Sequence, residues 1–390
     1  MQRKANPFIL VIDDEVTLLQ SVAVYLEDSG FIVKCAEDGK KGLEIFRNNH
    51  PDLVLTDLHM PVLSGLEVLN TISKESPETP VIVISGAGEL NDAIAALRLG
   101  AWDYVTKPIS DLQVLEHAIK KALQTKKLQE ENTQYAQRIA HNLKILEEDQ
   151  AAGRKVQLTM LPMEHEIINN FEFIFRMLPS LQLCGDFVEY FRISADIIGV
   201  YVADVSGHGA SSAFITILLK SIISKYQVHY TANKDDTILY PAKLMAALSA
   251  EIYNAKLNKY ITLIYGVIDT STSVFSYGVA GHYPNPILYN SKVGAKILTG
   301  EGFPIGIMAS VQYEAQSISL QAGDHLFMFT DGIMEVLMPG NSLELKEQAL
   351  LQAVQNSKGE IGALLSACGV SANSTVAQPD DITVLVMSHI

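Results

Sequence analysis

Residues 8–125 alternate between short apolar runs and longer segments in which apolar residues recur every three to four positions. The short runs are typical of buried strands and the longer segments of amphipathic helices. Repeated strand–helix pairs with short connections indicate an α/β fold, a doubly wound five-stranded parallel sheet. The expected strands are Phe8–Ile12, Phe31–Cys35, Leu53–Thr56, Val81–Ile84 and Tyr104–Val105, and the expected helices lie near 15–28, 39–48, 65–75, 90–99 and 111–124.

Carboxylates follow two of these strands. Functional residues in such sheets lie beyond the carboxyl ends of the strands, where the strand order reverses. In the order 2-1-3-4-5 the first and third strands are neighbours, which brings Asp13 and Asp14 next to Asp57. Carboxylates at one edge repel one another unless a cation lies between them, and all-oxygen ligands suit Mg²⁺. The sequence therefore predicts a magnesium site here.

The remaining strand ends fit phosphoryl chemistry. An aspartate beside Mg²⁺ can attack a phosphoryl group and form an aspartyl phosphate. Ser85, after the fourth strand, and Lys107, after the fifth, would then contact the phosphoryl oxygens. The alternative is that acids at strand ends are ordinary helix N-caps. That alternative explains any one of these acids, but not all of them at a single edge.

This arrangement resembles the receiver domain of two-component response regulators. The resemblance rests on Asp13–Asp14, Thr56-Asp-Leu-His-Met-Pro-Val-Leu-Ser-Gly65, Ser85, Tyr104 and Lys107–Pro108. It implies that Asp57 is the phosphoacceptor and that Ser85 and Tyr104 form the switch pair. It also implies Mg²⁺ bound by Asp13, Asp14 and Asp57, and a cognate histidine kinase as partner. We expect this domain to span residues 1–124.

Residues 111–160 contain one glycine and no proline and are rich in Lys, Gln, Glu, Ala and Leu, which indicates a long helix. Six of its residues follow alternating spacings of four and three, the seam of a coiled coil: Leu128, Asn132, Tyr135, Ile139, Asn142 and Leu146. We expect a helical linker over residues 125–162 that pairs two chains into a homodimer. The alternative is an exposed linker helix packed on one domain. Residues 152–162 resemble the lead-in helix of bacterial stress-response phosphatase domains.

Residues 163–390 change to runs of strands followed by helices, which indicates an α+β domain with antiparallel sheets flanked by helices. The expected strands include Phe171–Met177, Asp186–Ile193, Ile198–Ala203, Ile261–Ile268, Val274–Val279 and Ile382–Met387, and helices are expected at 210–226, 241–257, 343–356 and 360–368. Aspartates again lie at strand ends: Asp186, Asp204, Asp331 and Asp380–Asp381. Any one of them could be a turn residue. Together, they predict two hard cations that orient a phosphate for in-line attack.

The same region resembles the PPM (PP2C-like) metal-dependent Ser/Thr phosphatases, in the branch that regulates bacterial sigma factors. The matching segments are Gly185-Asp-Phe187, Asp204-Val-Ser-Gly-His-Gly209, Ala280-Gly-His-Tyr-Pro284, Phe303-Pro-Ile-Gly306, Thr330-Asp-Gly-Ile-Met-Glu335 and Asp380-Asp-Ile-Thr383. One departure is Cys184, where the family usually has glycine. The other is that the acid expected three residues after Asp186 is Glu189 in this chain. Neither departure removes a type of ligand, but Glu189 is expected to alter the surroundings of the metal site.

This resemblance implies roles for individual residues. Asp204 would bridge two Mn²⁺ or Mg²⁺ ions, with the Val205 carbonyl as a further ligand. Asp331 and Asp380 would complete one metal, and Asp186 would serve the other. His208 is a candidate general acid or else a turn histidine, and both interpretations stay open, whereas His282 is expected to be structural. The substrate in this family is often a phosphorylated anti-sigma-factor antagonist of the STAS fold.

Composition limits the partners. The chain has 29 Lys and Arg against 44 Asp and Glu, a net charge of −15. Nucleic-acid affinity comes mostly from neutralising phosphates, so a duplex-binding role is not expected. Three widely spaced cysteines indicate neither a zinc site nor a disulfide framework. Because the apolar windows are too short to span a bilayer, we expect a cytoplasmic protein without a membrane partner.

Two functions of different classes follow. The first is a protein phosphatase whose activity is controlled by phosphorylation of the receiver. The second is an adaptor or scaffold that binds a sigma factor or an anti-sigma antagonist, because the same domain order resembles the adaptor that delivers the stationary-phase sigma factor to a protease. Asp331 and Asp380 discriminate between the two, since losing them would make catalysis implausible, and both are present.

Overall fold

The computed structural model describes residues 6–86, 90–109, 111–207, 209–370 and 379–390. The chain divides into two compact units, Met1–Leu143 and Lys144–Ile390, which we describe in turn. Among the described residues, no helix is both long enough and apolar enough to cross a membrane.

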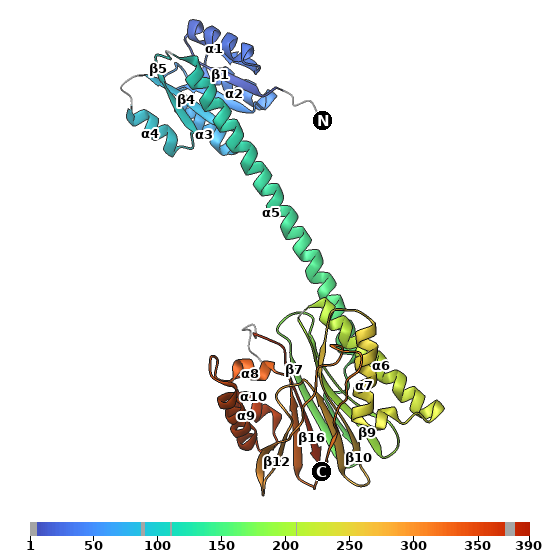
Figure 1. Ribbon diagram of the computed structural model, residues 1–390. Helices are drawn as coiled ribbons and strands as arrows, with labels where there is room; N and C mark the ends of the chain where they lie inside the picture. Colours follow the sequence, from blue (N-terminus) through green and yellow to red (C-terminus); the bar gives the residue numbers. More distant parts are fainter. Residues whose placement is uncertain (1–5, 87–89, 110, 208, 371–378) are drawn as a thin grey trace. The chain divides into compact units, whose positions relative to one another are not determined.

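The first unit is a parallel sheet with strand order β2-β1-β3-β4-β5 and helices on both faces (Figure 1). Its elements are β1 Phe8–Ile12, α1 Val16–Asp28, β2 Ile32–Ala36, α2 Gly39–Asn49, β3 Leu53–Asp57, α3 Gly65–Glu75, β4 Val81–Gly86, α4 Leu90–Arg98, β5 Asp103–Lys107 and the start of α5, Leu112–Met160. The predicted doubly wound fold is confirmed. The edge strand β5 buries Val105 alone, which explains why its apolar run was so short.

Alternation along the strands supplies two apolar layers. Ile9 and Val11 of β1 pack with α1 and α5, whereas Leu10 and Ile12 pack with α2 and α3. This follows from the period of two, which points successive side chains to opposite faces of a sheet. The buried strands hold the carboxyl edge of the sheet rigidly, and the polar residues predicted to be functional follow that edge.

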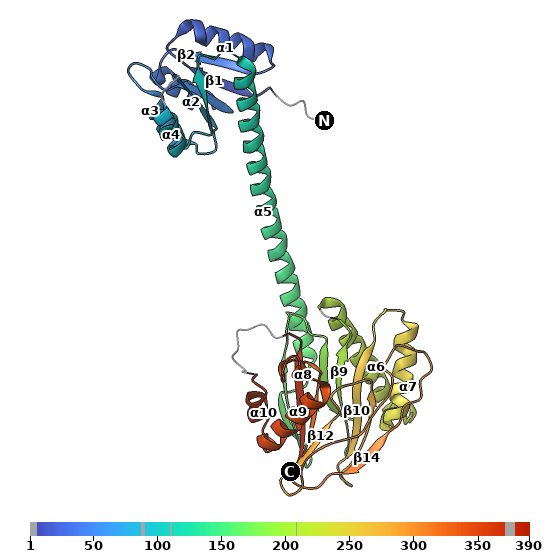
Figure 2. The ribbon, with the colours of Figure 1, turned by 60° about the vertical axis from the view of Figure 1, so that its left-hand side comes forward.

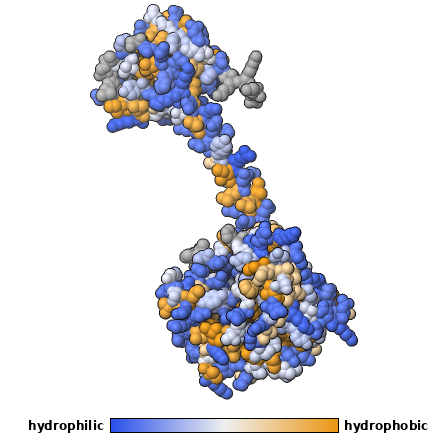
Figure 3. All heavy atoms as spheres, viewed as in Figure 1, coloured by the Kyte–Doolittle hydropathy of each residue, from blue (hydrophilic) through white to orange (hydrophobic). Residues whose placement is uncertain are grey.

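Helix α5 is 49 residues long and continues past residue 143, where the first unit ends. It includes most of the predicted linker. Residues 132–149 of this helix are all exposed to solvent. Apolar side chains are visible on this exposed stretch in Figure 3. The helix expected over this segment is present, whereas its pairing in a coiled coil stays a prediction.

The second unit contains two antiparallel sheets, with orders β14-β11-β10-β9-β8 and β13-β12-β15-β16-β7-β6 (Figure 2). Its strands are β6 His165–Ile168, β7 Phe171–Leu178, β8 Asp186–Arg192, β9 Ile197–Val205, β10 Ile261–Asp269, β11 Val274–Ala280, β12 Ile287–Asn290, β13 Gly294–Ile297, β14 Gln316–Ser319, β15 Asp324–Phe329 and β16 Ile382–His389. Its helices are α6 Ala210–Asn233, η1 Thr237–Leu239, α7 Pro241–Asn254, α8 Gly332–Val336, α9 Leu343–Ser357 and α10 Ile361–Ala367.

Three apolar cores stack through this unit. The central one lies between the two sheets, the second joins β8–β10 to α6 and α7, and the third joins β12, β15 and β16 to α8–α10. The predicted sandwich of antiparallel sheets flanked by helices is confirmed. The strands that the sequence did not reveal, β6, β12, β13 and β14, have four residues each, too few for a clear alternating pattern.

Candidate functional site

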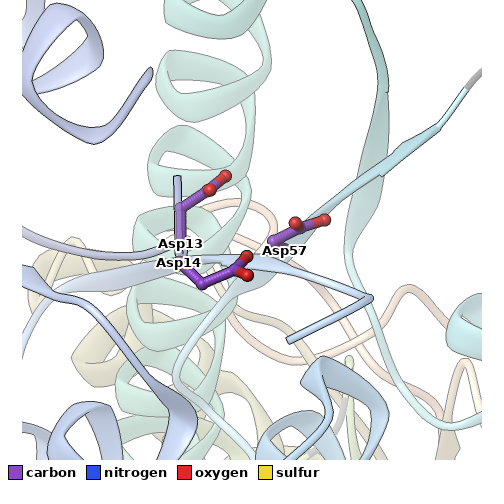
Figure 4. Close-up of side chains that lie close together, drawn as sticks. All are labelled: Asp13, Asp14 and Asp57. Carbon is purple, nitrogen blue, oxygen red and sulfur yellow. The ribbon is translucent and has the colours of Figure 1, made fainter. Parts of the chain in front are cut away.

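The first candidate site lies at the carboxyl edge of the parallel sheet. Asp13 follows β1, Asp57 ends β3, and one carboxylate oxygen each from Asp13, Asp14 and Asp57 lies within 4.8 Å of the others. Figure 4 shows the three side chains gathered there. Asp13 and Asp57 are buried and Asp14 is exposed. The strand order brings the three together, as the sequence predicted.

Lys107, the last residue of β5, is the cation of this cluster. Its Nζ lies 2.8 Å from Asp57 Oδ2 and 2.9 Å from Asp13 Oδ2. Burial raises the pKa of Asp13, and Lys107 opposes part of that shift. Partial burial works against the charge of Lys107, but hydrogen bonds to Asp57 and Asp13 raise its pKa. One ammonium does not balance three carboxylates, so the cluster keeps a net negative charge. The carboxylate oxygens are a donor set that fits a divalent cation such as Mg²⁺.

The predicted switch pair occupies adjacent strands. Ser85, in β4, is 1 % exposed, whereas Tyr104, in β5, is 37 % exposed and pairs opposite Val83. The segment between Asp57 and α3 is held by a capping box, in which Ser64 and Glu67 exchange hydrogen bonds. Ser85 therefore lies inside the carboxyl edge and Tyr104 at its surface.

The second candidate site is the acid edge of the sandwich, by which we mean Asp186, Asp204, Asp331 and Asp380. Asp186 begins β8 and pairs directly with Asp204, which is next to last in β9. By the period of two, Asp204 shares a face with Val200 and Val202, which line the space between the sheets. Asp331 follows β15 and Asp380 precedes β16, both in the facing sheet. Two sheets thus contribute to one acidic region.

Electrostatics show that these carboxylates influence one another. Burial, followed by Asp331, Asp380 and Asp381, raises the pKa of Asp204 to about 7. Burial and Asp380 raise the pKa of Asp331, and burial and Asp204 raise that of Asp186. Every charge that acts on Asp204 in this way is another carboxylate. This donor set fits hard divalent cations, which would relieve the repulsion.

The second set is less tightly gathered than the first. Within the part of the chain that the structure describes, only Asp13, Asp14 and Asp57 place three potential ligand atoms of this kind within 4.8 Å of one another. Val205 contributes a carbonyl near this site, and a Cβ at position 185 would lie 3.0 Å from that oxygen, so Gly185 leaves it accessible. His208 lies outside the described residues.

Three residues near Asp186 have contacts that the sequence did not predict. Thr330 and Thr383 each donate a hydrogen bond of 2.6 Å to Asp186 Oδ2. Asp381 accepts hydrogen bonds from the Ser180 hydroxyl and from the Gly185 backbone N–H, each 2.8 Å, and so fixes the loop before Asp186. The Asp-Asp pair at 380–381 was visible in the sequence, but its division into two roles was not.

Glu189 and His282, which are near the acid edge in the predicted motifs, both form side-chain hydrogen bonds. Glu189 accepts hydrogen bonds from Lys220 and from Tyr201, the latter at 2.6 Å. It therefore forms a partly buried ion pair with Lys220, and neither of these partners belongs to the acid edge. His282 is buried, and its Nε2 donates to the Phe329 carbonyl while Nδ1 contacts the Thr262 hydroxyl. These contacts agree with a structural role for His282.

Comparison with known proteins assigns both units. Residues 9–120 match the response regulator receiver domain, and residues 194–390 match the model of stage II sporulation protein E (SpoIIE). The chain is 22 % identical over 337 residues to the Regulator of RpoS of Escherichia coli strain K12, covering 85 % of this chain and 96 % of that protein. It is 37 % identical over 123 residues to the regulatory protein AtoC of the same strain, covering 32 % of this chain and 26 % of AtoC.

One solved structure is similar to the first unit, and another is similar to the second. A response regulator receiver domain protein from Clostridium thermocellum is 44 % identical and covers 31 % of this chain and 98 % of its own, with a TM-score of 0.30. The RsbU and RsbW domains of Rv1364c from Mycobacterium tuberculosis are 21 % identical and cover 58 % of this chain and 62 % of their own, with a TM-score of 0.46. By the match over residues 194–390, half of its length, the chain belongs to the SpoIIE family, whose PP2C-like domain here follows a response regulator receiver domain.

Proposed function

We propose that this response regulator uses phosphorylation of its receiver to control a metal-dependent protein serine/threonine phosphatase in the cytoplasm. The proposed substrate is a phosphorylated anti-sigma-factor antagonist of the STAS fold or a similar signalling protein. The observation that carries the proposal is the acid edge, where the charges that raise the pKa of Asp204 all belong to other carboxylates. Such an arrangement favours bound cations over any purely structural role.

In the receiver, a histidine kinase is the phosphodonor and Asp57 accepts the phosphoryl group on its carboxylate. Mg²⁺ held by Asp13, Asp14 and Asp57 supplies neutralising charge when bound. Lys107, 2.8 Å from Asp57, would shift from the carboxylate to a phosphoryl oxygen. The Ser85 hydroxyl would donate to another, with Tyr104 as its switch partner.

In the phosphatase, Asp204 would contact both cations, with the Val205 carbonyl as a further ligand. Asp331 and Asp380 would complete one of the two metal sites, and Asp186 would serve the other. Two Mn²⁺ or Mg²⁺ ions supply, when bound, the Lewis-acid chemistry that hydrolysis of a phosphomonoester needs. Thr330 and Thr383 orient Asp186 through hydrogen bonds to one of its oxygens. His208 is the candidate proton donor to the leaving serine or threonine oxygen.

The end of α5 supports the proposed coupling. Gln157 is buried, donates a 2.8 Å hydrogen bond to the Cys184 carbonyl and accepts one of 3.2 Å from the Cys184 N–H. Cys184 lies two residues before Asp186. Lys220 of α6 donates to the Met160 carbonyl in the last turn of α5. Movement of this helix would therefore be transmitted to the acid edge.

We also propose three functional segments, namely a receiver at 1–124, a helical linker at 125–162 and a phosphatase domain at 163–390. The linker would form a homodimer along its seam. Four apolar seam residues support this because more than half of each side chain is exposed: Leu128, Tyr135, Ile139 and Leu146. Apolar surface of this kind at heptad spacing is suited to a second copy of the same helix.

An adaptor is the second candidate function. The observation that favours it is the likeness to Regulator of RpoS, which extends over 85 % of this chain and therefore over both units. In that case the second unit would bind a sigma factor or an anti-sigma antagonist, with weak or dispensable catalysis.

Turnover with Mn²⁺ or Mg²⁺ distinguishes the two candidates. Wild-type protein should hydrolyse p-nitrophenyl phosphate, and Asp331→Asn should lower the rate by about 100-fold or more, because even the partners of metal ligands are worth 10–100-fold. Equal rates near background for both proteins would leave the adaptor. Both proteins should be assayed with either metal.

Beryllofluoride, which mimics a phosphoryl group on Asp57, tests control by the receiver. It should change the rate of the wild-type protein by about 5–150-fold, the range of ordinary allosteric coupling. Asp57→Asn should remove the response without changing the metal requirement. An equal response in both proteins would exclude the proposed control.

A further inference from the structure

A groove opens beside the acid edge, at the end of α7. Its volume is about 440 Å³ and its lining includes Tyr253, Lys256, Leu257, Lys259, Tyr260 and Ile307. These residues come from the end of α7, from the loop between α7 and β10, and from the loop that follows residue 305. Figure 2 shows α7 beside α6 on the same sheet. We call this surface the α7 groove.

The α7 groove has apolar walls that are open to solvent. Tyr253 is 47 % exposed, Leu257 42 %, Tyr260 45 % and Ile307 44 %. Single exposed apolar residues are common on proteins, but a contiguous group with tyrosines is typical of an interaction surface. The walls therefore have the composition that a flexible protein segment with an apolar side chain would contact.

The groove is joined directly to the loop that follows Asp204 and the end of β9. Lys259 donates through Nζ to the Ser206 carbonyl at 2.6 Å and to the Ser212 hydroxyl at 3.3 Å. The Tyr260 N–H donates to Ser206 Oγ at 3.1 Å, and the Ser206 N–H donates to the Tyr260 carbonyl at 3.0 Å. A ligand in the groove would thus lie next to the loop that leads from Asp204.

The groove also supplies positive charge where the rest of the chain is acidic. Neither Lys256 nor Lys259 forms an ion pair with any residue that the structure describes, although the chain has a net charge of −15. A phosphoryl group carries about −1.5 to −2 charges at neutral pH. It would be repelled by the carboxylates of the acid edge. The ammonium groups of Lys256 and Lys259, in a groove that contacts the loop after Asp204, would offset that repulsion.

We infer that the α7 groove is the docking surface for the phosphorylated segment of the protein substrate, with an apolar side chain next to the phosphorylated serine or threonine. The inference rests on the proposed function, because it places the substrate of that site. Two lysines are too few for a membrane patch, which takes about four to eight. Charge complementarity and the apolar walls together favour a phosphopeptide.

Binding of a defined probe tests the inference without requiring catalysis. The probe is a fluorescein-labelled peptide with the non-hydrolysable phosphonate analogue of phosphothreonine between two leucines. Anisotropy with the Mn²⁺-loaded full chain should give a Kd that the double variant Lys256→Ala, Leu257→Asn raises about tenfold or more. Lys259 is left intact because it holds the Ser206 carbonyl.

A matched control comes from the turn between β12 and β13. Lys292 and Val293 are adjacent and exposed, like Lys256 and Leu257. The double variant Lys292→Ala, Val293→Asn should keep the Kd within about twofold of wild type. Replacing the leucines of the probe by alanine should weaken binding to wild type more than binding to Leu257→Asn, because the two changes remove the same contact.

Several results would overturn the inference. They are equal Kd values for the two double variants, no binding of the probe to wild type, or groove-dependent binding to phosphatidylglycerol vesicles with none to the peptide. Turnover of p-nitrophenyl phosphate tests the proposed function separately. Groove-dependent binding without turnover would remove the phosphatase and keep the docking surface. Turnover with groove-independent binding would do the reverse.

Discussion

The two acid clusters of this protein differ in what balances their negative charge. In the receiver, the Lys107 ammonium lies within 2.9 Å of both Asp13 and Asp57. In the acid edge, by contrast, the charges that raise the pKa of Asp204 all belong to carboxylates, and together with burial they raise it to about 7. Aspartates at strand ends therefore form one site whose negative charge is partly balanced by a lysine, and one site in which the neighbouring charges have the same sign.

The clusters nevertheless share a backbone device. Next to each cluster a helix begins with a glycine that packs closely against the backbone carbonyl of an aspartate. A Cβ at Gly65 would lie 1.9 Å from the Asp57 carbonyl oxygen, and one at Gly332 would lie 1.9 Å from that of Asp381. Since real Cβ atoms do not approach so closely, only glycine lets α3 and α8 start this near to their sites.

The largest effect that separates the clusters should come from added metal. Each cation site adds about 2.7 kcal/mol to the unfolding free energy when free metal is 100-fold above Kd, so two sites add about 5 kcal/mol. Mn²⁺ should therefore stabilise the second unit about twice as much as the receiver. Calorimetry of the full chain measures both, and Trp102 fluorescence reports the receiver alone. Equal stabilisation of the two units would contradict the comparison.

Removing the Lys107 ammonium from the receiver is expected to lower the unfolding free energy by a smaller amount. Lys107→Met leaves the buried carboxylates of Asp13 and Asp57 without their ammonium, at a cost of about 1–3 kcal/mol of unfolding free energy. Mg²⁺ should restore most of it. Urea unfolding followed by Trp102 fluorescence measures the change. Lys120→Met is the control, because its exposed pair with Glu116 is worth less than about 1 kcal/mol. Similar losses for both variants would refute the assigned role of Lys107.

The hydroxyls of the acid edge should have a smaller effect. Thr383→Val keeps the shape of the side chain and removes its hydrogen bond to Asp186. The expected loss is about 1.5 kcal/mol of unfolding free energy in metal-free protein, the upper end of the range for one intramolecular hydrogen bond. Circular dichroism during urea unfolding measures it, and Thr231→Val, exposed on α6, serves as control. No difference between the variants would show that Asp186 does not need this donor.

The smallest expected effect is the pH response of His282. Burial lowers the pKa of His282 below its usual value near 6.5, so the folded protein holds it neutral. Its contribution to stability is therefore present above pH 6.5 and is lost as the pH falls through 6.5 toward the folded pKa, with a loss of at most about 1.4 kcal/mol at pH 5.5. Comparing the unfolding free energies of wild type and His282→Gln across pH 5.5–8 isolates this contribution. Parallel curves would contradict the prediction.

The sequence was sufficient for the features that follow from strand geometry. The parallel order of β1 and β3 makes Asp13, Asp14 and Asp57 neighbours, and this could be predicted from the alternating pattern. The partners of Asp186 could not be, because Thr330 and Thr383 are 144 and 197 residues away and meet it only through the pairing of two sheets. Gln157 was similarly hidden, because it is a polar residue in the later part of α5, where the residues around it in the sequence are exposed or half-buried.

The number of Mn²⁺ ions bound by the full chain tests the central claim most directly, because the proposed chemistry requires cations at the acid edge. Isothermal titration should give about three ions for wild type, one in the receiver and two in the phosphatase. Asp204→Asn should leave about one, and Asp57→Asn should leave the two phosphatase ions in place. If wild type and Asp204→Asn bind the same number, the acid edge is not a metal centre and the account is wrong.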